Sequence, residues 1–182
     1  MRADARKNYE HLLATAREAL AEHGAEASLR DIARRADVGM GTLYRHFPTR
    51  DALLEALLRT SLDALTRQAN DLEDAVEPGA ALLSWFGDAL AFTRTYNGVV
   101  TVMAEALEDE ASALHASCSK VRKAGARLLE RAQAAGAVRI DLDGTDLFAL
   151  MGALAWTGEQ PVFALRTDHL AEIITRAICD AR

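Results

Sequence analysis

The apolar positions of this chain recur at helical spacing almost throughout. Between residues 9 and 20 they fall at i, i+3, i+4, i+7 and i+11, which predicts an amphipathic helix that ends at Gly24. Residues 28–31, SLRD, form a capping-box pattern and predict the start of a short second helix. No stretch shows the period-two alternation of β-branched residues that is typical of strands. The pattern therefore predicts an all-α fold.

The segment VGMGTLYRHFPTR, residues 38–50, predicts a tight turn followed by another short helix. Leu43 and Phe47 are spaced i, i+4, so their side chains would face the core together. Pro48 would end this helix, and Thr49 would cap a long helix with leucines at positions 53, 54, 57, 58 and 65. Two short helices joined by a turn of three or four residues form a helix-turn-helix, whose second helix enters the DNA major groove.

The rest of the chain also has helical patterning, interrupted at residues 77–79, 97–98, 136, 141–144 and 160–161. Asp143 and Asp146 predict a second helix cap. The last helix carries an apolar stripe at positions 170, 173, 174, 177 and 178, which fits either a self-complementary dimer interface or packing on the protein's own core.

Charge is distributed unevenly along the chain. The 182 residues carry a net charge of −6, but residues 1–59 sum to +1 and the remainder to −7. Two different roles for the two regions would explain this asymmetry. The first residues lack the apolar core of a signal peptide, and the two cysteines form no CxxC motif, so a cytoplasmic setting is expected.

If Leu43 and Phe47 point inward, the opposite side of their helix carries donors and aromatic rings without a carboxylate. Such a surface suits a polyanion, because hydroxyl and guanidinium groups bond phosphates and base edges. The alternative for this helix taken alone is an ordinary mixture of core and surface residues beside a proline. The DNA-binding residues predicted here are Ser28, Arg30, Met40, Gly41, Thr42, Tyr44, Arg45, His46 and Arg50.

The run SLRDIARRADVGMGTLYRHFPTRDALLEALL resembles the DNA-binding segment of the TetR family of bacterial transcription regulators. The resemblance implies a helix-turn-helix DNA-binding domain at residues 1–50 and a helical ligand-binding and dimerisation domain at residues 51–182. It also implies that Ser28, Arg30 and Arg50 hold the DNA backbone while the helix from Met40 reads the groove. The function implied is a homodimeric repressor that binds a palindromic operator and is released by a small-molecule inducer, with no cofactor and no membrane partner.

A ligand pocket would need an apolar lining with a few polar groups. Aromatic residues and methionine at helical spacing are more often core than pocket, so each candidate is weak individually. Acidic residues near such a pocket would favour a cation, or would simply form a solvated face. The candidates are Trp85, Phe86, Phe92, Tyr96, Met103, His115, Phe148 and Trp156.

Other functions have weaker support. The GMGTLY run lacks the third glycine of a dinucleotide site, DLDGTD lacks calcium-loop spacing, and the five histidines form no metal-ligand set. No catalytic motif indicates an enzyme. A thiol sensor that uses Cys118 or Cys179 is an alternative, although lone cysteines are usually small buried apolar residues.

Overall fold

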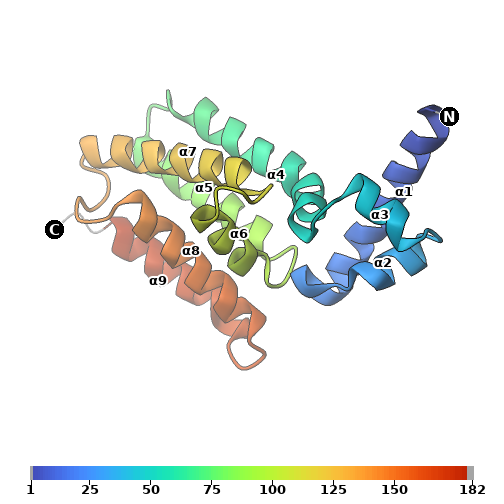
Figure 1. Ribbon diagram of the computed structural model, residues 1–182. Helices are drawn as coiled ribbons and strands as arrows, with labels where there is room; N and C mark the ends of the chain where they lie inside the picture. Colours follow the sequence, from blue (N-terminus) through green and yellow to red (C-terminus); the bar gives the residue numbers. More distant parts are fainter. Residues whose placement is uncertain (1, 180–182) are drawn as a thin grey trace. The chain divides into compact units, whose positions relative to one another are not determined.

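The computed structural model describes residues 2–179. Within this range the chain is helical and contains no strand, which confirms the predicted all-α fold with an N-terminal helix-turn-helix (Figure 1). Short 3-10 helices, η1 (Gly24–Glu26) and η2 (Ala164–Arg166), precede α2 and α9. The α-helices are α1 (Arg2–His23), α2 (Leu29–Arg35), α3 (Met40–His46), α4 (Arg50–Leu72), α5 (Pro78–Thr93), α6 (Val99–Glu108), α7 (His115–Ala134), α8 (Gly144–Glu159) and α9 (Thr167–Cys179).

The chain divides into two compact units that are not continuous in sequence. Unit 1 comprises residues 1–60 and 96–116, so it contains α1, α2, α3, the first half of α4, and α6. Unit 2 comprises residues 61–95 and 117–182, and contains the rest of α4, α5, most of α7, α8 and α9. The boundary at residue 50 between a DNA-binding and a ligand-binding domain stays a prediction about function.

Unit 1 is organised by the apolar stripes that the sequence predicts. Leu12, Ile32 and Leu43 are fully buried, and Phe47 is nearly so, which confirms that α3 packs through its Leu43 and Phe47 side. Gly24 has a φ of 70°, the left-handed geometry expected where α1 ends. The turn between α2 and α3 contains Asp37 with a φ of 52°, a conformation that aspartate tolerates better than most residues.

Local capping rules explain several helix boundaries. Thr49 Oγ1 accepts a hydrogen bond from the Ala52 amide at 3.1 Å, as predicted for the cap of α4. Asp143 and Asp146 form a complete capping box at α8. One boundary was not predicted: α6 ends at Glu108 and α7 begins at His115. The connecting turn is held by the Asp109 carboxylate, which accepts from the Ala111 amide at 2.9 Å.

Unit 2 is built around a buried tryptophan. The Trp85 side chain is fully buried, and its indole N–H donates to the Leu65 carbonyl of α4 at 3.0 Å. Gly125 of α7 allows this ring to pack closely, since a Cβ atom at that position would overlap the Trp85 ring. In the described range no helix is both long and apolar enough to cross a membrane.

Candidate nucleic-acid interface

Helix α3 presents one side to the core of unit 1 and the other to solvent. Gly41 and Arg45 are exposed. Tyr44 is 48% exposed, although its large aromatic ring could be buried in a core. Met40, Thr42 and His46 are half-buried at the margins of this surface. The residues predicted to face DNA therefore form the accessible side of the helix, and none of those on α3 is buried.

Two contacts fix the side chains of this surface. Arg45 Nη2 donates to Thr42 Oγ1 at 3.2 Å, which orients the guanidinium along the exposed side of α3. The His46 ring packs edge-on against Tyr9 of α1, with centroids 5.8 Å apart, and Tyr9 lies 5.3 Å from Phe47. This aromatic cluster ties the carboxyl end of α3 to α1 and limits the rotation of His46.

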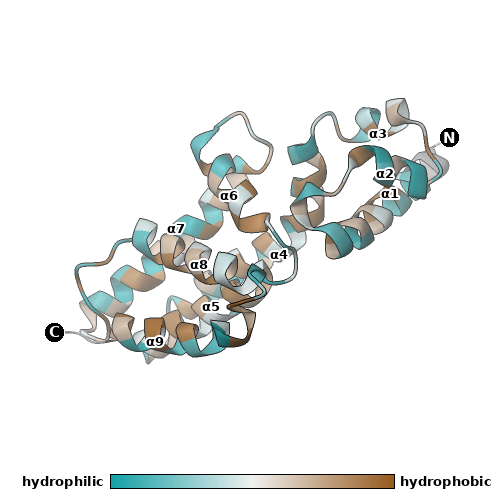
Figure 2. Cartoon of the chain, turned by 90° about the horizontal axis from the view of Figure 1, so that it is seen from below, coloured by the Kyte–Doolittle hydropathy of each residue, from teal (hydrophilic) through white to brown (hydrophobic). Residues whose placement is uncertain are grey.

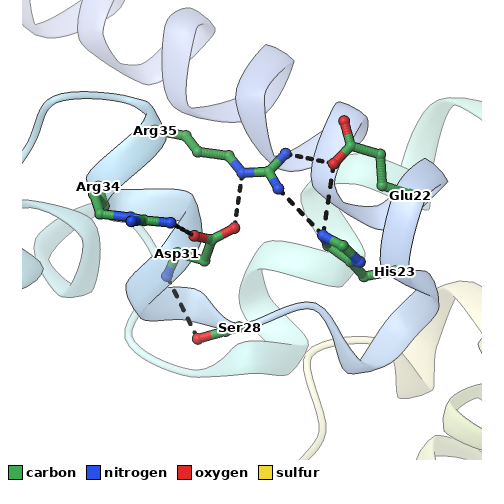
Figure 3. A network of polar contacts seen from close by, with 6 residues as sticks. All are labelled: Glu22, His23, Ser28, Asp31, Arg34 and Arg35. Atoms are coloured by element: carbon green, nitrogen blue, oxygen red, sulfur yellow. Dashed lines mark hydrogen bonds and ion pairs between the residues drawn. The ribbon is translucent and has the colours of Figure 1, made fainter.

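The start of α2 supplies a second part of the surface. Ser28 caps the helix, and its Oγ accepts from the Asp31 amide at 3.4 Å. The Ser28 side chain is exposed, as is that of Arg30. Asp31 does not complete the capping box in the way the sequence predicts, because its carboxylate bonds Arg34 and Arg35 (Figure 3). Ser28 and Arg30 are thus both accessible to solvent at the start of α2.

An ion-pair network connects α2 with the end of α1 (Figure 3). Arg35 Nε lies 2.7 Å from an Asp31 carboxylate oxygen, and Arg35 Nη1 lies 2.6 Å from Glu22 Oε2. The hydrogen bond from Arg34, together with the charge of Arg35, lowers the pKa of Asp31 below its ordinary value. The hydrogen bond to Glu22 raises the pKa of Arg35. The network fixes α2 against α1 while the solvent-facing Arg34 stays at the surface.

Arg50 differs from the other predicted DNA-contacting residues. Its Nε donates to the Ala25 carbonyl at 3.1 Å, and its Nη2 donates to the carbonyls of Ala25 and Ala27. Both alanines are buried. The guanidinium thus bridges the start of α4 to the η1 turn, and its Nε and Nη2 donors are engaged in unit 1.

Sequence reasoning missed the partners that orient this surface. Tyr9, Glu22 and Arg35 come from outside the predicted helix-turn-helix face or were assigned no role there, yet each contacts a residue of α2 or α3. Arg34 was also missed, although its i, i+3 spacing from Asp31 is a sequence signal for an ion pair.

The predicted pocket residues occupy different environments. Trp85 and Phe86 are buried in the core of unit 2, and Phe148 packs 6.3 Å from Trp85. Trp156 is 58% exposed on α8. Phe92 alone of the eight lines the groove between α4 and α5 in unit 2.

The three remaining candidates, Tyr96, Met103 and His115, belong to unit 1. Tyr96 is buried, whereas the other two are half-buried. His115 Nδ1 lies 2.9 Å from the Ala106 carbonyl, so this ring helps to close the turn between α6 and α7. The eight residues therefore share no common lining, and their role in ligand binding stays a prediction.

A helix-turn-helix with a solvent-facing second helix, followed by further helices, defines a class of DNA-binding transcription regulators. Residues 12–57 match the family model of bacterial regulatory proteins of the tetR family, and residues 77–178 match that of the SbtR-like transcriptional regulator C-terminal domain. This chain belongs to the TetR family of transcriptional regulators.

Individual proteins show the same relationship. The TetR transcriptional regulator SCO0520 from Streptomyces coelicolor is 30% identical with a TM-score of 0.61, and the alignment covers 94% of this chain and 98% of that one. A TetR regulatory protein from Mycobacterium vanbaalenii is 28% identical with a TM-score of 0.53, over 98% of both chains. An HTH-type regulator from Staphylococcus aureus, SAR0097, is 36% identical over 74 residues, which is 39% of this chain and 38% of that protein.

Proposed function

We propose that this regulator is a homodimeric repressor that binds a palindromic operator and releases it when a small molecule binds. The observation that carries the proposal is the solvent-facing side of α3, which presents Thr42, Tyr44 and Arg45. The opposite side of this helix is packed into the core through Leu43 and Phe47. This arrangement offers hydroxyl, aromatic and guanidinium groups to a duplex from a rigid element.

The reading helix and the start of α2 are assigned complementary roles. Met40, Gly41, Thr42, Tyr44, Arg45 and His46 would meet the major groove. Ser28 and Arg30, both exposed at the start of α2, would hold phosphates. Arg50 is also predicted from the sequence to hold the DNA backbone, but its Nε and Nη2 donate to the carbonyls of Ala25 and Ala27, so a positioning role is favoured for it.

The apolar surface on α8 and α9 supports a dimer. Hydrophobic residues recur along both helices (Figure 2). Trp156 is 58% exposed and Ile173 is 49% exposed, while Leu170 and Ile174 of the same stripe are only half-buried within one chain. Large exposed apolar side chains on adjacent helices favour a self-complementary contact, which a two-fold axis would bury on both copies.

Release by a ligand would be a population shift. The ligand would bind more tightly to a dimer whose two α3 helices do not match successive major grooves, which lie about 34–36 Å apart. Helix α4 is the natural lever, because it is continuous from Arg50, at the edge of the helix-turn-helix, to Leu72 in unit 2. Because operator DNA lies in the bacterial cytoplasm, the protein would act there.

Selection of DNA fragments bound by the purified protein tests this proposal. We expect a palindromic sequence to be enriched, and we expect fluorescence anisotropy to give two protomers per site. Ser28→Ala, Arg30→Ala and Tyr44→Ala should each weaken binding to that sequence. Enrichment of no sequence, or equal binding of operator and random duplex by parent and variants, would refute the assignment.

A further inference from the structure

A groove on unit 2 runs between α4 and α5. Its volume is about 560 Å³, and every residue that lines it belongs to unit 2. Small-molecule sites in proteins usually measure roughly 300–1,000 Å³, so the groove has the size of such a site. Its apolar part consists of Leu65, Phe92 and two alanines, Ala64 and Ala91.

The polar atoms of the groove are uncharged. The polar residues of the lining are Ser61, Gln68 and Thr95, and none of them has an ionisable side chain. Gln68 Nε2 donates to the Asp88 carboxylate at 2.5 Å, which holds the amide in place and leaves its oxygen able to accept a hydrogen bond. No residue of the lining is charged, and the neighbouring Asp88 carboxylate is already bonded to Gln68, so the lining itself offers an ionised ligand no partner for an ion pair, whereas an uncharged apolar molecule with hydrogen-bonding groups would match it.

The groove lies where the chain enters and leaves unit 2. Ser61 is the first residue of unit 2 on α4, and Thr95 is the last residue before the chain returns to unit 1. Leu65 connects the groove to the core, because its carbonyl accepts the indole N–H of the buried Trp85. A molecule in this groove would therefore contact α4 immediately after it leaves the unit that carries the helix-turn-helix.

We infer that this groove is the effector site of the regulator, and that its ligand is an uncharged, mainly apolar small molecule with one or two hydrogen-bonding groups. This inference rests on the proposed function for one point: that the bound molecule changes the affinity for operator DNA. The binding of such a molecule to the groove does not depend on DNA.

Two dyes that differ by one charge test the inference on the full chain. N-phenyl-1-naphthylamine is uncharged, and 1-anilinonaphthalene-8-sulfonate adds a sulfonate to the same ring system. Both dyes fluoresce strongly only in an apolar environment, so their emission on the unaltered chain reports binding. We expect the uncharged dye to bind about tenfold or more tightly than the sulfonate.

A matched pair of alanine variants locates the binding. Ala91→Leu fills the groove from an exposed position of α5, and Ala80→Leu makes the same change at an exposed position of α5 outside the groove. Leucine is a good helix former, so both variants should fold. Ala91→Leu should weaken the uncharged dye about tenfold, and Ala80→Leu should change its affinity by less than about twofold.

The inference is overturned if Ala91→Leu and Ala80→Leu bind the uncharged dye equally, or if the sulfonate binds more tightly. Operator affinity is measured in parallel with the dye bound and absent, and it should fall when the groove is filled. Dye in the groove without any change in operator affinity overturns the effector assignment. Failure to select any operator sequence refutes the proposed function instead, and the dye measurements still decide the ligand site.

Discussion

Replacement of Arg50 separates a phosphate contact from a positioning role. In unit 1 its guanidinium bridges the carbonyls of Ala25 and Ala27, which are both buried. Arg50→Ala leaves two acceptors without their charged donor, and such a loss costs about 2 kcal/mol when water partly replaces the donor, as it can for a side chain that is 34% exposed. For a chain of this size the thermal midpoint should fall by roughly 4–8 °C.

Salt dependence of operator binding gives the second measurement. Each phosphate contact contributes about 0.9 to the slope of log K against log salt, so the loss of one contact per protomer changes the slope of a dimer by about 2. Arg30, exposed at the start of α2 and proposed to hold a phosphate, is the control. We expect Arg30→Ala to reduce the slope with little loss of stability. Arg50→Ala should lower both affinity and thermal midpoint with the slope almost unchanged.

Arg50→Lys makes the test sharper. Lysine keeps the positive charge but has a single ammonium instead of a planar fork, so it serves a phosphate better than it bridges two carbonyls. The variant should recover little of the lost stability. If Arg50→Ala melts at the parental temperature, or if Arg50→Lys restores operator affinity fully, the positioning argument is wrong and the guanidinium contacts DNA.

Three other perturbations have defined outcomes. Tyr44→Ala should weaken operator binding by about 1–3 kcal/mol in anisotropy titrations, comparable to a mismatched base pair, with an unchanged thermal midpoint; a parental affinity would remove Tyr44 from the interface. Ile173→Glu should shift the protein to monomers in sedimentation velocity, because it places a charge in the proposed apolar interface; a dimer that persists would place the interface elsewhere. The pKa of Asp31 is lowered in the folded protein, so its contribution to stability is complete above its ordinary value of 3.8 and is lost as pH falls through the lower folded value. Asp31→Asn should therefore lower the urea midpoint at pH 7 and match the parent at the acid end of that transition; an equal deficit at both would refute the linkage.

Much of the helix-turn-helix could be predicted from the sequence because its signals are local. The i, i+4 spacing of Leu43 and Phe47, the stop at Pro48 and the cap at Thr49 depend only on neighbours within one turn of helix. The turn between α6 and α7 was missed because it has no glycine or proline. It is made by Asp109 and Ser112, whose side chains accept from amides two residues later.

Contacts between distant residues could not be predicted in this way. Arg50 bonds carbonyls 23 and 25 residues earlier, and a backbone carbonyl has no sequence signature. The predicted pocket residues do not line one common cavity for a related reason. Helical periodicity indicates that Trp85 and Phe92 turn away from solvent, but it does not distinguish a close-packed core from a groove. That distinction depends on Gly125, which lets α7 close on the Trp85 ring.

The segments that make up unit 1 bear on how a ligand in unit 2 would change the affinity for DNA. Helix α6 belongs to unit 1, where the Asn97 carbonyl before it accepts from the Ala25 amide at 2.7 Å and Ser112 after it donates to Asp51 at 2.6 Å. The chain passes between the units at residues 60–61, 95–96 and 116–117. Ser61 and Thr95, which lie at the first two of these crossings, line the proposed groove. If a ligand in the groove changes DNA affinity through these two crossings, the coupling between the two sites must be reciprocal. Operator DNA must then weaken binding of the uncharged dye by the same factor as the dye weakens operator binding. Unequal factors at equilibrium would mean that the two measurements report different sites.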